Sequence, residues 1–269
     1  MHRISAFYAN VKQGIRESGL PLAVVLQRLC DTGISALDVD YCEIKQGLPP
    51  EIAQTGFVVN SIYAFLNFTA EGSMEEAKRA VDAAAQYNAA MMFVPEKLND
   101  EQAASLKECT DATDVAHCLS QNEIAVCTAK SLEALALYGR TKGVSVCVEN
   151  FDSRRSLTER KAELLWLFGQ APHLMFNPDT GNSATCGEDI AELFTIFRDR
   201  VVNIHCKDRI RTEKGYKCIT GGEGDMPIRE LCTQLLDSGY TGAFSVEVFG
   251  VPNILDSICR SALYLGTIA

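Results

Sequence analysis

Short apolar runs alternate with longer amphipathic segments along the whole chain. Eight of the runs have the length and composition of β-strands. The predicted strands span residues 3–9, 34–44, 57–68, 90–96, 144–151, 174–179, 201–208 and 242–250. Helical spacing is found at 21–33, 51–56, 73–89, 99–140 with a break near 110–120, 157–169, 187–199, 227–238 and 253–266. Ser73 and Glu76 have the spacing of a capping box, which predicts that a helix starts there.

The regular alternation of strands and helices predicts a parallel sheet, because each helix must carry the chain back to the start of the next strand. Eight such units in one chain of 269 residues predict a closed (β/α)8 TIM barrel. No linker or change in composition divides the chain, so we expect a single domain over 1–269. An open, doubly wound sheet is the alternative. The segment "FYANVKQG" after the first strand lacks the glycine-rich fingerprint typical of that fold.

Each of the last four predicted strands ends on a residue that can bind a metal. These residues are Glu149, Asp179, His205 and Glu247. Side chains alternate along a strand, so residues two apart share a face. In all four strands the face of the terminal residue carries small or polar side chains, and the opposite face is mostly apolar. We therefore expect the four residues to point into the barrel at its carboxyl rim, where barrel enzymes carry their active sites.

The same alternation predicts a polar layer just below these four residues. It consists of Cys147, Asn177, Asn203 and Ser245, which could support the site through hydrogen bonds. Three carboxylates in one small volume repel each other, and a divalent cation removes that conflict. Three carboxylates and one imidazole suit Mn²⁺ or Mg²⁺, and Zn²⁺ or Co²⁺ also accept such ligands.

Composition and charge narrow the classes of partner. The net charge of −10 disfavours nucleic acid, because an acidic surface repels phosphate backbones. The eleven cysteines form no CxxC pair and indicate reduced thiols in a cytoplasmic protein. No apolar stretch has the length of a membrane span or of a signal peptide, so we expect a soluble protein without a membrane partner. "GGEGD" at 221–225 reads as a flexible loop, and it lacks the lysine of a phosphate-binding P-loop.

Four segments of the C-terminal half carry a family resemblance. "VCVENF", "FNPDTGN", "VVNIHCKDR" and "GEGDMPIRELCTQLLDSGYTGAFSVEVFG" closely resemble the sugar phosphate isomerase/epimerase family of xylose isomerase-like barrels. The resemblance is specific over about 144–250. It implies a (β/α)8 barrel that binds one divalent metal through Glu149, Asp179, His205 and Glu247, and it implies a small, sugar-like substrate. The family includes dimers and tetramers, so a homo-oligomer is compatible with the sequence.

The resemblance also implies catalytic roles. In the ketose 3-epimerase branch, the two glutamates are the acid/base pair, which would be Glu149 and Glu247 here. The expected chemistry is proton transfer through a metal-stabilised cis-enediolate, which leads to isomerisation or epimerisation. Arg211 matches an arginine of that branch six residues after the metal histidine. Asn182 stands where the branch has histidine, and "NFDSRR" stands where it has "PLNRxE", so the branch is open.

Further residues could contact the substrate. Lys207 and Arg211 could hold a substrate oxygen or a phosphate. Tyr8, Glu43, Tyr63 and Glu96 lie at the predicted ends of the first four strands and could shape specificity. Inosose or hydroxypyruvate isomerases and an inosose-type dehydratase are alternative branches, and a barrel that binds sugar without catalysis is a third class. A DNA endonuclease of the same superfamily is disfavoured by the negative charge and by the lack of further strand-end histidines.

Overall fold

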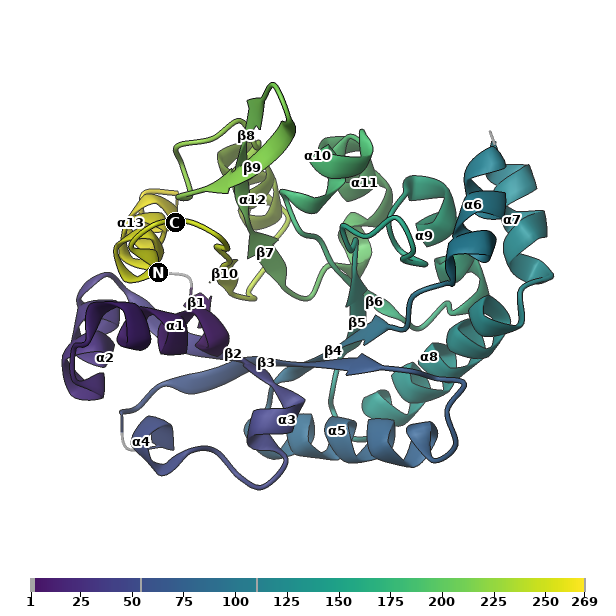
Figure 1. The fold of residues 1–269 in the computed structure, drawn as a ribbon. Coiled ribbons are helices and arrows are strands. Elements are labelled where there is room, and N and C mark those ends of the chain that lie inside the picture. The colour runs from purple at the N-terminus through teal and green to yellow at the C-terminus, as the bar shows by residue number, and fades with distance from the viewer. Residues whose placement is uncertain (1–2, 54, 110, 269) are drawn as a thin grey trace.

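A computed structural model describes residues 3–53, 55–109 and 111–268. Eight parallel strands form one sheet in the order β6-β5-β4-β3-β2-β1-β10-β7 (Figure 1). These strands are β1 Ile4–Phe7, β2 Ile34–Asp40, β3 Val58–Leu66, β4 Ala90–Pro95, β5 Val146–Glu149, β6 Met175–Asn177, β7 Ile204–Cys206 and β10 Phe244–Val246. Neighbours in this order follow one another in the chain as barrel strands, apart from β1 and β10, the first and last strands, which also pair with each other.

The two end strands, β6 and β7, close the sheet. Parallel bridges join Phe176 to Val201 and Asp179 to His205. The backbone N–H of Val202 donates to the carbonyl of Phe176 at 3.1 Å, and that of His205 donates to the carbonyl of Pro178 at 2.9 Å. The prediction of a (β/α)8 TIM barrel is therefore confirmed, and the open-sheet alternative is excluded.

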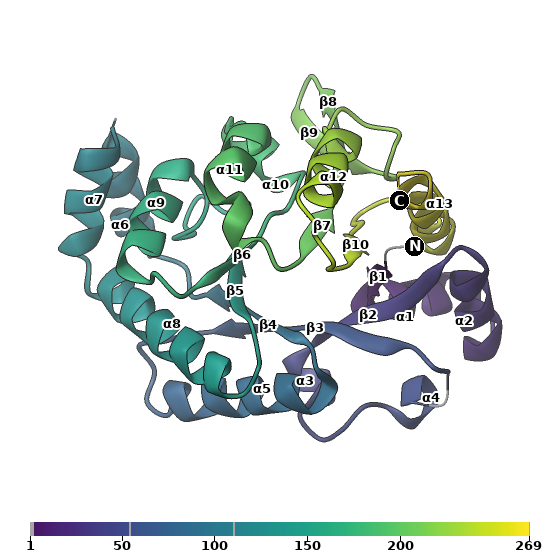
Figure 2. The same cartoon turned by 180° about the vertical axis from the view of Figure 1, so that it is seen from behind.

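Helices surround the strands on the outside (Figures 1 and 2). They are α1 Tyr8–Ser18, α2 Leu22–Asp31, α3 Tyr41–Ile44, α4 Pro50–Ala53, α5 Ser73–Tyr87, α6 Asp100–Glu108, α7 Ala112–Ser120, α8 Glu123–Thr141, α9 Lys161–Gln170, α10 Asn182–Cys186, α11 Ile190–Phe197 followed by a 3₁₀ turn Arg198–Arg200, α12 Ile228–Asp237 and α13 Ile254–Gly266. In the described part of the chain, none of them has the length and apolarity needed to cross a bilayer. The last helix, α13, packs beside β1 and α1, so the two ends of the fold meet.

Several element boundaries differ from the prediction for local reasons. The first strand ends at Phe7 because α1 starts at Tyr8, and β2 ends at Asp40, whose side chain accepts the N–H of Cys42 at 2.7 Å. Ser73 is the first residue of α5 and not its cap. Gly72 precedes it with φ 76°, and the Ser73 hydroxyl donates to the carbonyl of Phe68.

The predicted helical region 99–140 has two breaks instead of one. Each of its three helices, α6, α7 and α8, has its own cap, and the caps are the side chains of Asn99, Asp111 and Asn122. Residue 110 lies outside the described residues. The expected single break near 110–120 is therefore wrong in number and extent.

A β-hairpin follows the seventh barrel strand in a region for which the sequence predicted neither a strand nor a helix. Its strands are β8 Asp208–Thr212 and β9 Gly215–Ile219, which pair antiparallel with Arg209 opposite Cys218. In Figure 1 it stands next to α10 and α12, and β9 contacts α10. The hairpin therefore adds side chains to the rim of the barrel.

Alternation along the strands separates two apolar layers. The large outer layer packs between the sheet and the helices. A small inner cluster consists of Phe7, Tyr63, Met92, Val94 and Cys147, which come from strands β1, β3, β4 and β5. This inner cluster lies on the side of the barrel interior that β1, β3, β4 and β5 form.

Candidate functional site

The structure brings four potential metal ligands together at the carboxyl rim. Glu149 is the last residue of β5, Asp179 follows β6, His205 lies in β7 and Glu247 follows β10 directly. All four side chains are buried, and one potential ligand atom from each lies within 4.8 Å of the others. Among the described residues, this is the one group of three or more such side chains that could hold a metal ion.

The distances inside the group suit a shared cation. Nδ1 of His205 lies 3.0 Å from Oε2 of Glu149 and 3.0 Å from Oε2 of Glu247. Two ligand atoms at right angles around an octahedral ion with bonds of about 2.1 Å are separated by about 3 Å. Oδ1 of Asp179 accepts the N–H groups of Gly181 and Asn182, both at 2.8 Å, so its second oxygen is directed to the centre of the group.

Lys207 enters the same group from the strand end beyond His205. Its buried ammonium lies 2.7 Å from Oδ2 of Asp179 and 2.7 Å from Oε1 of Glu247. Lys207 and a protonated His205 would offset two of the three negative charges. One carboxylate charge is left, and in a buried site it favours a further cation or an added proton.

The pKa values of the group follow from this crowding. Burial raises the pKa of Asp179 to about 6, against the opposing effect of Lys207. Burial also opposes ionisation of Glu247, but Lys207 and His205 outweigh it and lower the pKa of Glu247. Burial tends to lower the pKa of His205, yet the carboxylates of Glu247 and Glu149 raise it well above its ordinary value. A divalent ion would therefore compete with bound protons for these ligands.

A residue next to Glu149 fixes the position of Asp179. The side-chain oxygen of buried Asn150 accepts the backbone N–H of Asp179 at 2.7 Å. Its side-chain NH₂ donates to the backbone carbonyl of Asp179 at 3.0 Å and to the hydroxyl of Ser183 at 2.9 Å. The sequence analysis did not select Asn150. Its position directly after a strand-end glutamate was the available signal.

The predicted polar layer lies inside the barrel below the four residues. Oδ1 of Asn203 accepts from Ser245 at 3.2 Å and from Asn60 at 3.1 Å, and Asn60 also donates to buried Asp38. Asn177 donates to the sulfur of Met92 at 3.5 Å. Asn203 and Ser245 therefore belong to a hydrogen-bonded network with Asn60 and Asp38. Asn177 is joined to Met92 instead, and Cys147 packs in the apolar inner cluster, so the predicted layer is polar only in part.

A cavity of about 540 Å³ opens at Glu149 and Glu247, two of the four residues. It is lined by Glu149, Glu247, Lys207 and Tyr63 of the predicted set, and also by Phe7, Phe65, Phe151, Asp152, Arg209 and Phe249. The ring of Phe7 lies edge-on to His205 with centroids 4.9 Å apart. Burial raises the pKa of Tyr63, and the neighbouring carboxylates Asp40 and Glu43 raise it further, so its phenol stays protonated.

The other residues expected to contact substrate lie outside the lining of this cavity. Tyr8 is buried in α1 below the ammonium of Lys12, which also pairs with Glu43. Glu96 accepts a hydrogen bond from Thr69 at 2.9 Å. Arg211 is exposed on β8, and its backbone N–H donates to Asp225. Asn182 is buried and accepts from Lys207 at 2.9 Å, so it reaches the site through that lysine.

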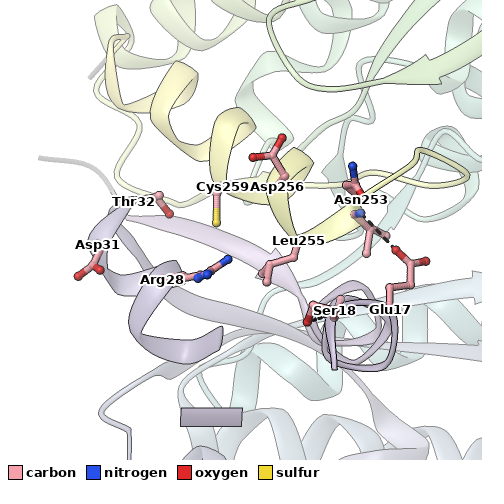
Figure 3. Close-up of a pocket in the computed structure, with 11 residues that line it drawn as sticks. Glu17, Ser18, Arg28, Asp31, Thr32, Asn253, Leu255, Asp256 and Cys259 are labelled. Carbon is pink, nitrogen blue, oxygen red and sulfur yellow. Dashed lines mark hydrogen bonds between the residues drawn. The ribbon is translucent and has the colours of Figure 1, made fainter. Parts of the chain in front are cut away.

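Another hollow lies far from this chemistry. It has a volume of about 480 Å³ and is formed by α1, α2 and the start of α13, with Glu17, Arg28 and Cys259 among its lining residues (Figure 3). Glu17 accepts the N–H of Ile254 there. No group of potential metal ligands lies in it within the described parts of the chain. The rim cavity is therefore the candidate site.

Comparison with known proteins agrees with the barrel fold of the chain. A family model described as xylose isomerase-like TIM barrel matches residues 50–262. No curated protein sequence matches the chain significantly. The family assignment therefore comes from the family model, with the fold in agreement.

Three solved structures illustrate the likeness in fold. A xylose isomerase-like TIM barrel protein from Mycobacterium smegmatis in complex with magnesium has 17% identity, 100% coverage of this chain, 96% of its own and a TM-score of 0.68. The 3-keto-D-glucoside 4-epimerase YcjR from E. coli has 14% identity, 99% and 100% coverage and a TM-score of 0.67. The IOLI protein with a bound zinc atom has 13% identity, 98% and 95% coverage and a TM-score of 0.68.

Proposed function

The chain belongs to the xylose isomerase-like TIM barrel family, and on that premise we propose that it is a divalent-metal-dependent isomerase or epimerase of a sugar-like substrate. The observation that carries the proposal is the convergence of Glu149, Asp179, His205 and Glu247 within 4.8 Å at the rim of a cavity. In two similar structures magnesium or zinc is bound, and a third is an epimerase.

The four side chains would hold the metal. Three carboxylates and one imidazole suit Mn²⁺, Mg²⁺, Zn²⁺ or Co²⁺. A bound divalent ion would supply Lewis-acid stabilisation for negative charge on substrate oxygens. Asn150, Gly181 and Asn182 hold Asp179 for that role through backbone contacts, and Lys207 would supply positive charge beside Asp179 and Glu247.

Glu149 and Glu247 would move the proton. Both line the cavity, and they approach His205 Nδ1 from β5 and from the end of β10. The lowered pKa of Glu247 keeps it ionised and able to accept a proton from carbon. Return of that proton to the neighbouring carbon gives an isomer, and delivery of a proton to the original carbon by the other glutamate gives an epimer. The phenol of Tyr63 can donate a hydrogen bond to a substrate oxygen.

Proton exchange tests the proposal. Protein loaded with Mn²⁺ in D₂O should incorporate deuterium at carbon next to the carbonyl of a ketose, an aldose or an inosose. Glu149→Gln and Glu247→Gln should each lower the rate about 10²-fold or more, because a positioned acid or base contributes about that much. Glu75→Gln, on the exposed surface of α5, is the matched control.

The products separate the alternatives. Label at C-1 or C-2 with a changed carbonyl position identifies an isomerase, an inverted centre identifies an epimerase, and loss of water identifies a dehydratase. Full exchange by Glu247→Gln would contradict the two-carboxylate scheme. Bound metal without exchange on any of these substrates would instead indicate a barrel that binds without catalysis.

A further inference from the structure

The cations that line the cavity are already paired with carboxylates of the protein. In the described residues these cations are Lys207 and Arg209. The ammonium of Lys207 has three donors, and they lie within 2.9 Å of Asp179, Glu247 and Asn182. Lys207 therefore has no donor left for an anionic group of a ligand.

Arg209 is paired with one carboxylate, through Nη2 of its guanidinium, while its buried Nε has no hydrogen-bond partner among the described residues. Its Nη2 lies 2.5 Å from Oδ2 of Asp152, and only 13% of its side chain is exposed. Asp152 itself lines the cavity. A phosphate or carboxylate that approached Arg209 would therefore also come close to the negative charge of Asp152, which repels it.

The glycine-rich loop at 221–225 is also occupied by a carboxylate of the chain. Oδ2 of Asp208 accepts the N–H groups of Gly222 at 2.8 Å and of Gly224 at 3.0 Å, and Oδ1 accepts that of Met226 at 3.2 Å. Clustered backbone N–H groups of this kind form anion-binding concavities. Here buried Asp208 fills the place that a phosphate oxygen would take.

Aromatic rings form much of the remaining wall of the cavity. Phe65 is 62% exposed and Phe249 is 46% exposed at its mouth. The ring centroid of Phe65 lies 6.2 Å from that of Phe151, and the ring centroid of Phe249 lies 6.4 Å from that of Phe7. Such rings offer flat apolar faces on which the C–H face of a neutral sugar or cyclitol can pack, whereas a charged ester would lose hydration there without a partner.

We propose that the cavity selects neutral sugar-like ketones over phosphorylated or carboxylated ones, and that the Arg209–Asp152 pair is the specificity-determining element. Asp152 holds the guanidinium and places a negative charge beside it. This inference rests on the proposed function, because it assigns the substrate class of the same site. It needs neither a particular sugar nor a particular reaction at the metal.

Calorimetry on the full-length, Mn²⁺-loaded protein tests the inference with matched probes. The probes are D-fructose and D-tagatose, each compared with its 6-phosphate ester. We expect the free ketoses to bind at least tenfold more tightly than the esters. Asp152→Asn removes the negative charge beside Arg209 with little change in shape. It should reduce the ratio of the free-ketose affinity to the ester affinity at least tenfold. Arg209→Gln should keep the preference for free ketoses, and Asp100→Asn, at an exposed aspartate near Arg155, is the matched control.

The outcomes separate this inference from the proposed function. Tighter binding of the esters by the native chain would overturn the inference, as would an Asp152→Asn protein with an unchanged ratio. A chain that holds Mn²⁺ but binds none of the four probes would overturn the assignment of a neutral sugar and leave the metal site standing. A chain that takes up no Mn²⁺ would overturn the proposed function itself.

Discussion

Asn150 shows how a single uncharged side chain can decide the geometry of the site. It binds both backbone polar groups of Asp179, which lies beyond the end of β6 and is bridged to His205 on its other side. Outer residues of this kind orient ligands and tune the affinity of a metal centre. The position of Asp179 therefore depends on the neighbouring strand as much as on its own.

Asn150→Ala should weaken metal binding more than it weakens the fold. Removal of the amide leaves the N–H and C=O of Asp179 without these partners, at a cost of about 1–3 kcal/mol for each group. Loss of such outer contacts typically lowers metal affinity by about 10–100-fold. Titration with Mn²⁺ measures the affinity, and urea unfolding measures the stability.

Asn122→Ala is the matched control for that experiment. It removes the cap of α8 and should cost about 1 kcal/mol of stability, while Mn²⁺ affinity stays unchanged. Equal Mn²⁺ affinities in Asn150→Ala and the native chain would show that Asp179 is held in place without the hydrogen bonds from Asn150.

The sequence alone predicted which strand-end side chains point into the barrel, but it did not predict which hairpin residues reach the cavity. Alternation placed Glu149 and Glu247 correctly on the inner face because each follows a run of buried strand residues. Arg209 and Arg211 share one face of β8, and only the hairpin's geometry puts the first at the cavity and the second in solvent. That choice depends on long-range packing, which a local pattern does not carry.

At the scale of elements, Asp208 joins the hairpin to the glycine-rich loop. Its buried carboxylate accepts four backbone N–H groups, from Arg209, Gly222, Gly224 and Met226. A side chain at position 224 would have its Cβ only 2.3 Å from Oδ1 of Asp208. The carboxylate and this glycine therefore define one folded unit at the barrel mouth.

Asp208→Ala should loosen that unit. Hydrogen bonds to a charged acceptor contribute about 1.5–3 kcal/mol each, and several are lost together, so we expect a loss of at least about 3 kcal/mol in stability. Hydrogen exchange should speed up at the amides of Gly222 and Gly224. Asp208→Asn keeps one acceptor oxygen, so its stability should lie between that of the native chain and that of Asp208→Ala. Native protection of both amides in Asp208→Ala would mean that the loop is held by other contacts.

The order of strands and helices followed from periodicity, whereas their ends did not. Strand runs were predicted too long because residues beyond the ladder, such as Tyr8 and Tyr41, are buried in helices and still look like strand residues. The start of α5 at Ser73 was mistaken for a cap because Gly72 takes that place with a positive φ. Caps depend on backbone angles, which the residue types indicate only loosely.

At the scale of the whole molecule, the candidate ligands come from four of the eight barrel strands. They are drawn from β5, β6, β7 and β10, and the bridge between Asp179 and His205 is also one of the contacts that close the barrel. Closure also requires β10 to pair with β1, so residues far apart in the chain must fold before the group exists. A metal at this place would therefore bind the folded chain and not the unfolded one.

Metal should consequently raise the unfolding temperature of the entire domain. A ligand that binds only the folded state at about 100 times its Kd adds about 2.7 kcal/mol. For a chain of 269 residues that corresponds to an increase of about 5 °C in Tm over protein treated with chelator. Asp179→Asn should lose most of the increase, because it removes one ligand charge at the closing bridge. Asp189→Asn, which keeps a capping side chain at the start of α11, should retain the increase in Tm.

Thermal unfolding of the three proteins with chelator and with excess Mn²⁺ measures the metal-induced change in Tm of each. Equal increases in Tm for the native chain and for Asp179→Asn would place the bound metal elsewhere. The four side chains lie within 4.8 Å of one another, so we expect the metal-induced stability to depend on the carboxylate of Asp179.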